Sequence, residues 1–166
     1  MYRYIDAFSQ RLTTLSQYVG AFSAAVMVLT LLLGVFYRYV LQDSLSWSDE
    51  IALLAASWTT FLFSSALVRR FEHVRVTLFL SLLPDALSGL FERINVLLVL
   101  IFGIAMVWTG YGFMEFTINQ VSPAIRYPLW VKNAALPVGG ALICVHAIAL
   151  LFRPGSLNAL REQDNG

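Results

Sequence analysis

The segment VGAFSAAVMVLTLLLGVFY, residues 19–37, runs for 19 positions without one charged side chain. A bilayer core about 30 Å thick needs roughly 20 apolar helical residues to cross it, because backbone groups in hydrocarbon must hydrogen-bond within their own helix. Residues 51–68, 94–114 and 134–152 meet the same test, and among them only His146 can carry a charge. The sequence therefore predicts four membrane-spanning helices.

Composition agrees with a membrane protein. Of the 166 residues, 58% are hydrophobic and 13% are charged, against roughly half and a quarter in a soluble domain. The net charge of +1 gives no basic surplus for a nucleic acid, and Cys144 alone forms neither an internal disulfide nor a thiolate metal cluster. We expect an all-α fold in which residues 1–166 form a single domain, with spans near residues 19–40, 51–68, 94–116 and 134–152.

The positive charges near the span ends predict an orientation. One side of the four spans carries Arg3, Arg11, Arg69, Arg70, Arg75, Arg93, Arg153 and Arg161, and the other carries Arg38, Arg126 and Lys132. Because positively charged loops stay cytoplasmic, this excess predicts that both termini are cytoplasmic.

Two segments have the pattern of amphipathic helices at the membrane surface. In residues 1–17 and just beyond, apolar residues recur at helical spacing: Ile5, Phe8, Leu12, Leu15 and Val19. We expect this segment to lie in the cytoplasmic interface or to lead into the first span. A second apolar stripe precedes Pro84, where the third long helix is expected to begin and to run to about Thr117.

The spans have no mid-membrane Asp, Glu, Lys or Arg, which a carrier needs in order to bind ions or charged substrates, so the chain alone is not expected to pump them. No nucleophile, phosphate-binding or metal-binding motif predicts an enzyme. A haem held by two histidines is disfavoured, because it needs a second histidine within the membrane, whereas His73 is expected in a cytoplasmic loop. For His146 we keep two readings, a hydrogen-bonded packing residue and a proton relay or quinone contact. Trp58, near the middle of its span, should pack against protein, and Gly139 and Gly140 should let helices approach closely.

A polar cluster between the first two spans has two interpretations, which can hold together. In the first, Ser46 or Ser48 caps the second helix, and the acids that follow suit its positive amino end. In the second, Arg38 pairs with Asp49 or Glu50, and Trp47 faces a partner protein.

The order of several motifs resembles the DctQ-type small membrane subunit of tripartite ATP-independent periplasmic (TRAP) transporters. These motifs are Arg38-Tyr39, Trp47-Ser48-Asp49-Glu50, Arg69-Arg70 with His73, Leu83-Pro84, the run from Ser122 to Pro128, and Pro137-Val138-Gly139-Gly140. The resemblance covers nearly the whole chain. It implies a subunit of the bacterial inner membrane without catalytic residues, metal or cofactor of its own.

By the same resemblance, the subunit would brace a large multi-spanning permease that carries the substrate and sodium sites. It would also help to dock a periplasmic substrate-binding protein, for uptake of an organic acid such as sialic acid or a C4-dicarboxylate. We expect structural or partner contacts at Arg38, Tyr39, Trp47, Asp49, Glu50, His73, Arg126 and Pro128. The rival hypotheses are the membrane anchor of a haem- or quinone-linked redox enzyme and a small homo-oligomeric exporter.

Overall fold

Four long helices make up most of the fold. The computed structural model describes residues 2–70 and 85–151, with side chains for residues 8–68 and 93–151. Its helices are α1 (Tyr2–Val40), α2 (Ser46–Arg70), α4 (Asp85–Phe116), the single turn α5 (Trp130–Asn133) and α6 (Ala135–Leu151). His73 and the amphipathic stretch expected before Pro84 lie outside the described residues.

Among the described residues, four helical segments are long and apolar enough to cross a membrane: Phe8–Val40, Ser46–Val68, Arg93–Phe116 and Trp130–Leu151. The prediction of an all-α membrane protein with four spanning helices is therefore confirmed. The third long helix also begins and ends within a residue of the expected positions. At 1.5 Å per residue its 32 residues extend about 48 Å, which exceeds the thickness of a bilayer core.

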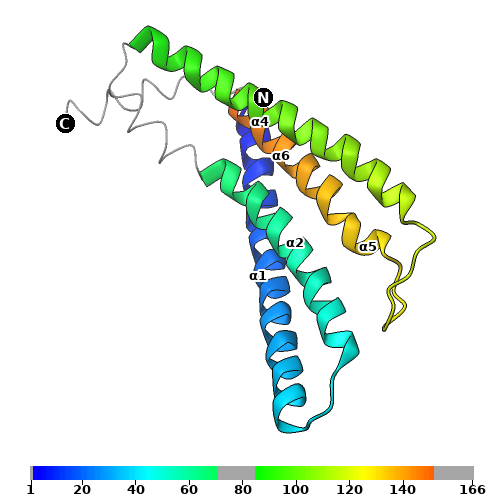
Figure 1. Cartoon of the computed structure of the whole chain (residues 1–166). Coiled ribbons are helices and arrows are strands. Elements are labelled where there is room, and N and C mark those ends of the chain that lie inside the picture. The colour runs from blue at the N-terminus through cyan, green and yellow to red at the C-terminus, as the bar shows by residue number, and fades with distance from the viewer. Residues whose placement is uncertain (1, 71–84, 152–166) are drawn as a thin grey trace, which may run out of the picture.

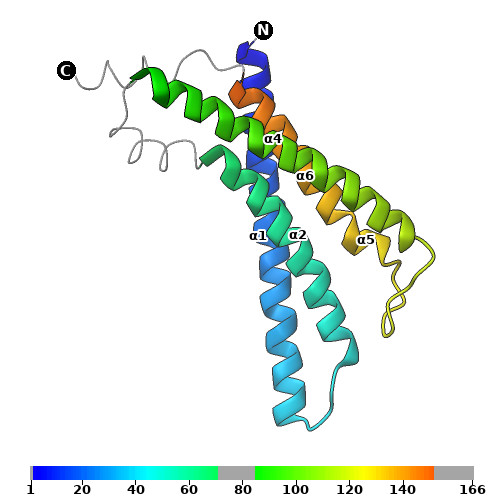
Figure 2. The same ribbon diagram turned by 45° about the horizontal axis from the view of Figure 1, so that its top comes forward.

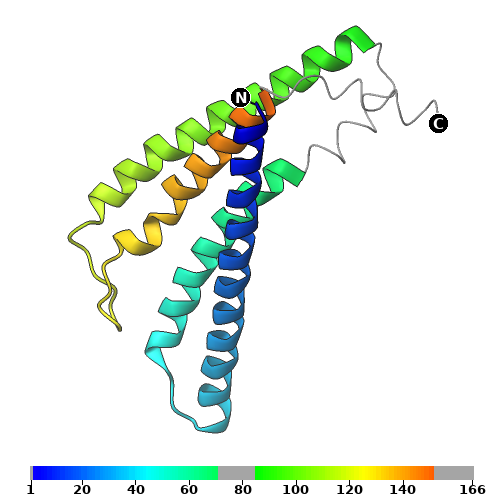
Figure 3. The same cartoon turned by 180° about the vertical axis from the view of Figure 1, so that it is seen from behind.

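The helices are arranged as two antiparallel pairs. Helix α1 packs along α2, α4 packs along α6, and the two pairs meet where α2 contacts α6. The pairs lie close together at the end where α1 begins and diverge toward the other end (Figure 1, and from behind in Figure 3). Helix α6 is thus the central element, since it contacts α2, α4 and, more briefly, α1.

The amino-terminal segment and the first span form one continuous helix, α1. Of the two expected arrangements, the segment therefore has the one in which it leads into the first span. The face that α1 turns toward the protein is made of small residues at helical spacing, Ser9, Thr13, Ser16 and Gly20. The apolar residues Phe8, Leu15 and Val19 are exposed. This distribution is expected of a helix in lipid, where small side chains form the helix contacts and large apolar ones face the hydrocarbon.

Adjacent glycines bring α6 into close contact with both neighbours. A Cβ atom on Gly140 would lie 2.8 Å from Cβ of Met106 and 2.9 Å from the carbonyl oxygen of Gly103, both on α4. A Cβ atom on Gly139 would lie 2.7 Å from Cβ of Phe61 on α2. The expected close approach of helices at this glycine pair is therefore present on two sides at once.

Candidate functional site

Glu50, in the first turns of α2, binds a loop that is remote in the sequence. The backbone N–H of Ala124 donates to Oε1 of Glu50 at 2.7 Å, and the N–H of Ile125 donates to Oε2 at 2.9 Å. Two successive backbone N–H groups that point the same way form a small concavity suited to an anion. The carboxylate therefore fastens the beginning of α2 to the loop that joins α4 to α5.

This loop, residues 117–129, has a hairpin-like shape of its own. The N–H of Ser122 donates to the carbonyl of Tyr127, the N–H of Leu129 donates to the carbonyl of Gln120, and both distances are 2.9 Å. The turn between them contains Arg126 with a positive φ of 61°. Figure 2 shows the loop descending from the end of α4 toward the beginning of α2.

Two further hydrogen bonds fix the base of the hairpin. The Asn133 side-chain amide donates to Oγ1 of Thr117 at 2.8 Å, which joins α5 to the end of α4. The indole N–H of Trp58 on α2 donates to the carbonyl oxygen of Val131 at 3.2 Å. Trp58 thus packs against protein, as the sequence predicted. The first half of α2, the end of α4 and the start of α6 are therefore linked into one unit at the Glu50 end of the fold.

The charge of Glu50 acts on the phenol of Tyr127, which lies in the same hairpin. Partial burial raises the pKa of the Tyr127 phenol, and the negative charge of Glu50 raises that pKa further. Both effects favour the neutral phenol, so Glu50 is the charged group of the pair at neutral pH.

Within the described hairpin, three other residues of the predicted contact set have no such partner. Arg38 and Tyr39 are exposed at the end of α1, and Asp49 is exposed on α2. Among the residues that the structure describes, Arg38 forms no ion pair with Asp49 or Glu50. The Glu50 carboxylate is directed at the two backbone amides instead.

Ser48, one of the two serines expected to cap the second helix, does not cap it. The Ser48 hydroxyl donates to the carbonyl of Leu45 at 2.8 Å, and Ser48 is buried against Gly34 of α1. A Cβ atom on Gly34 would lie 2.8 Å from Oγ of Ser48. Ser48 therefore acts as a packing residue between α1 and α2.

Of the predicted site residues, the structure brings Glu50 together with the hairpin that contains Arg126 and Pro128. Pro128 forms an isolated β-bridge with Val121. Trp47 is 37% exposed on the adjoining first turn of α2. The partner of Glu50 could not be predicted from the sequence, since the groups that bind its carboxylate are backbone amides. The only available signal was the prediction that the Trp47–Glu50 motif and the Ser122–Pro128 motif lie on the same side of the membrane.

At the opposite end of the fold, His146 of α6 is fully buried, and its Nδ1 lies 2.8 Å from Oγ of Ser9 on α1. This is the arrangement of a hydrogen-bonded packing histidine. Within residues 2–70 and 85–151, no three His, Cys, Asp or Glu side chains come together as a metal site.

The fold and the site define a class of protein: a multi-pass helical membrane protein whose polar linkages lie near the ends of its helices. Residues 5–155 match the family described as tripartite ATP-independent periplasmic transporters, DctQ component. The chain belongs to this family, which is a component of transporters and not an enzyme.

Individual relatives agree with the family. The chain is 23% identical to the C4-dicarboxylate TRAP transporter small permease protein DctQ of Vibrio cholerae, over 84% of this chain and 71% of the relative. It is 27% identical to the sialic acid TRAP transporter small permease protein SiaQ of the same organism, over 81% of this chain and 76% of the relative. It is 24% identical to the C4-dicarboxylate TRAP transporter small permease protein DctQ of Rhodobacter capsulatus, over 89% of this chain and 62% of the relative.

Proposed function

We propose that this chain is the small permease subunit of a TRAP uptake system, in which it braces a large multi-spanning permease and helps to dock a periplasmic substrate-binding protein. The family membership supports the transporter role. The large permease, in this proposal, carries the substrate and sodium sites, and the chain described here carries neither. Both termini face the cytoplasm of a bacterial inner membrane.

The observation that carries the proposal is the link between Glu50 and the backbone N–H groups of Ala124 and Ile125. A subunit that braces another protein needs a surface whose shape does not depend on its partner. The carboxylate provides this by joining α2 to the hairpin, and Trp58 and Asn133 hold the hairpin against the helices. Exposed Trp47, Ile125 and Arg126 lie on this unit and are available to a docking protein.

The membrane-facing surfaces suit a bracing role. Several large apolar side chains of α1 and α4 are exposed, and they include Phe22, Leu32, Phe102 and Trp108. The spans at residues 51–68 and 94–114 have no charged residue that would bind a travelling ion. Such helices fit a scaffold that packs against a transport subunit and does not itself move substrate.

Reconstitution tests the proposal. Proteoliposomes that contain the large subunit and receive the binding protein are compared with and without this chain, under a sodium gradient. Sialic acid and a C4-dicarboxylate are the first labelled substrates, since relatives are named for them. We expect accumulation only when this chain is present. Unchanged uptake after its omission, or uptake by this chain alone in vesicles, would contradict the proposal.

A further inference from the structure

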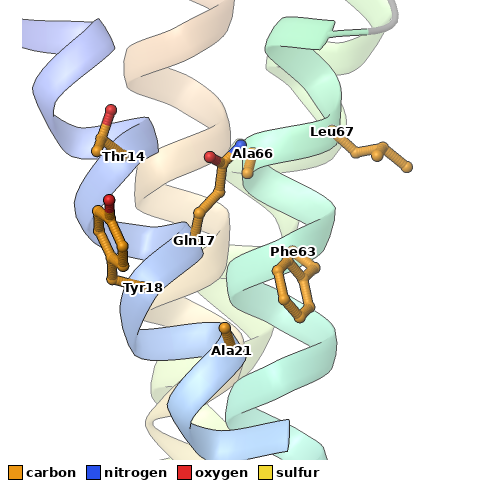
Figure 4. A pocket seen from close by; sticks show the side chains of 7 residues that line it. All are labelled: Thr14, Gln17, Tyr18, Ala21, Phe63, Ala66 and Leu67. Carbon is orange, nitrogen blue, oxygen red and sulfur yellow. The ribbon is translucent and has the colours of Figure 1, made fainter.

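A hollow of about 420 Å³ opens between α1 and α2, at the end of the fold remote from Glu50. It is lined by Thr14, Gln17, Tyr18, Ala21, Phe63, Ala66 and Leu67 (Figure 4). Thr14 and Tyr18 also line a second hollow of about 500 Å³, whose other lining residues are Gln10, Arg11 and Leu15. The two hollows therefore adjoin each other on one side of α1.

The chemistry of this surface changes in one direction along α1. A cation and a primary amide come first, at Arg11 and Gln10, and the hydroxyls of Thr14 and Tyr18 follow. Beyond them the lining is apolar, at Ala21 and Phe63. In Figure 4 the Tyr18 ring runs along the helix with its hydroxyl toward Thr14, at the polar end. Tyr18 is 74% exposed, so this hydroxyl can donate to a ligand.

The length of the gradient matches one leaflet of a membrane. From Arg11 to Ala21 is ten residues of continuous helix, or about 15 Å at 1.5 Å per residue. Half of a bilayer core about 30 Å thick has the same length. A molecule that occupied both hollows would therefore be polar at the membrane surface and apolar toward the bilayer centre.

We propose that the hollow holds one glycerophospholipid with a net negative headgroup, its phosphate at Arg11 and Tyr18 and one acyl chain along Ala21 and Phe63. The positive charge of Arg11 selects an anion, and none of the residues that line the two hollows is acidic. Small residues at Ala21 and Ala66 leave room for the chain between the helices. The site does not depend on the transporter role proposed above, since it is formed by this chain alone.

Native mass spectrometry of the full chain tests this proposal. The protein is purified from an equimolar mixture of phosphatidylcholine and phosphatidylglycerol, and the lipids that remain bound are identified. We expect the wild type to keep one phosphatidylglycerol. Arg11→Gln should reduce the preference for phosphatidylglycerol about fivefold, the size of one arginine contact with anionic lipid. The matched control is Arg93→Gln, which removes the same charge from an exposed position on α4 and should change nothing.

A second pair of variants tests the apolar half of the site. Ala21→Phe fills the hollow, and Ala105→Phe adds the same side chain at an exposed position of α4. We expect only Ala21→Phe to lose the bound lipid. The proposal would be overturned by equal retention of the two lipids, or by equal effects of Arg11→Gln and Arg93→Gln. It would also be overturned if the wild type forms dimers that Ala21→Phe disrupts, because a second copy of the chain would then occupy the hollow.

Discussion

Gly140 and Gly103 lie in backbone contact where α6 crosses α4. The carbonyl oxygen of Gly103 is 2.9 Å from the place where a Cβ atom on Gly140 would be, and the backbone nitrogen of Val107 is 3.0 Å from it. Helices in lipid gain much of their association energy from close backbone packing of this kind. Because backbone atoms and Cβ of Met106, and not the ends of flexible side chains, surround Gly140, any larger residue must separate the two helices.

Gly140→Ala is therefore expected to lower the free energy of unfolding by about 1–3 kcal/mol, the usual cost of overpacking. The control is Gly112→Ala on α4, where nothing lies within 4 Å of an added Cβ. There the loss of glycine's backbone freedom should stabilise the helix by about 0.5–1 kcal/mol. Denaturant titration in detergent micelles measures both values. Equal effects of the two substitutions would contradict the packing argument.

Glu50→Gln is expected to loosen the hairpin of residues 117–129. A glutamine keeps one acceptor oxygen, but its NH₂ group meets the second backbone N–H as a donor facing a donor, and the charge is lost. Hydrogen exchange at the amides of Ala124 and Ile125 should accelerate several-fold, while exchange within α6 stays unchanged. Asp49→Asn, on an exposed neighbour, is the matched control and should leave both amides protected. Unchanged exchange in Glu50→Gln would show that the carboxylate does not hold the loop.

The helices of this protein could be predicted from the sequence, because each depends on local properties. Uncharged runs of the required length gave the four spans, and Pro84 placed the start of α4 to within one residue. The glycine pair at Gly139 and Gly140 also pointed correctly to close packing. These signals need no knowledge of which helix lies beside which.

The pairing of Glu50 with Ala124 and Ile125 was beyond the sequence argument for a physical reason. The acid had an apparent partner nearby in Arg38, whereas its actual partners are backbone N–H groups more than seventy positions away, which any residue except proline provides. The sequence also did not show which face of α1 packs against the other helices. An apolar stripe and a stripe of small residues such as Ser9 and Ser16 both recur at helical spacing, and only the packing identifies which one meets the protein.

Tyr127 is expected to titrate above its usual range. Its pKa is raised by burial and by Glu50, so between the pKa of the unfolded chain, about 10, and the higher folded value, the folded protein keeps a proton that the unfolded chain has lost. Stability should therefore fall as the pH rises through this window and should be unaffected below it. Ultraviolet difference spectra of the wild type against Tyr127→Phe isolate this titration. In Glu50→Gln the pKa should move back toward the usual value, and a pKa that stays in place would exclude the charge of Glu50 as a cause.

Ser9→Ala is expected to destabilise the fold at the end opposite to the hairpin. The substitution removes the hydroxyl 2.8 Å from Nδ1 of the buried His146, and the net value of such a bond is about 1 kcal/mol. Ser57→Ala is the control, since the Ser57 hydroxyl only donates to the carbonyl of Leu53 at an exposed position. It should change the free energy of unfolding by less than about 0.5 kcal/mol. If both variants lose the same stability, the Ser9–His146 contact has no special role in joining α1 to α6.

The Glu50 end of the molecule is expected to matter more for partner proteins than the His146 end. Glu50→Arg directs a cation at the two N–H groups that bind the carboxylate, and Trp47→Ala removes a partly exposed aromatic side chain from the same unit. Loss of a tryptophan at an interface commonly costs more than 1 kcal/mol, so we expect at least a severalfold weaker association with the large subunit or the binding protein. His146→Ala removes a side chain that is buried within the chain and should leave association closer to normal. Pull-down of the large subunit and sodium-driven uptake, both normalised to the amount of folded protein, compare the three variants. Equal pull-down and equal uptake in all three would contradict the assignment of partner contacts to the Glu50 end.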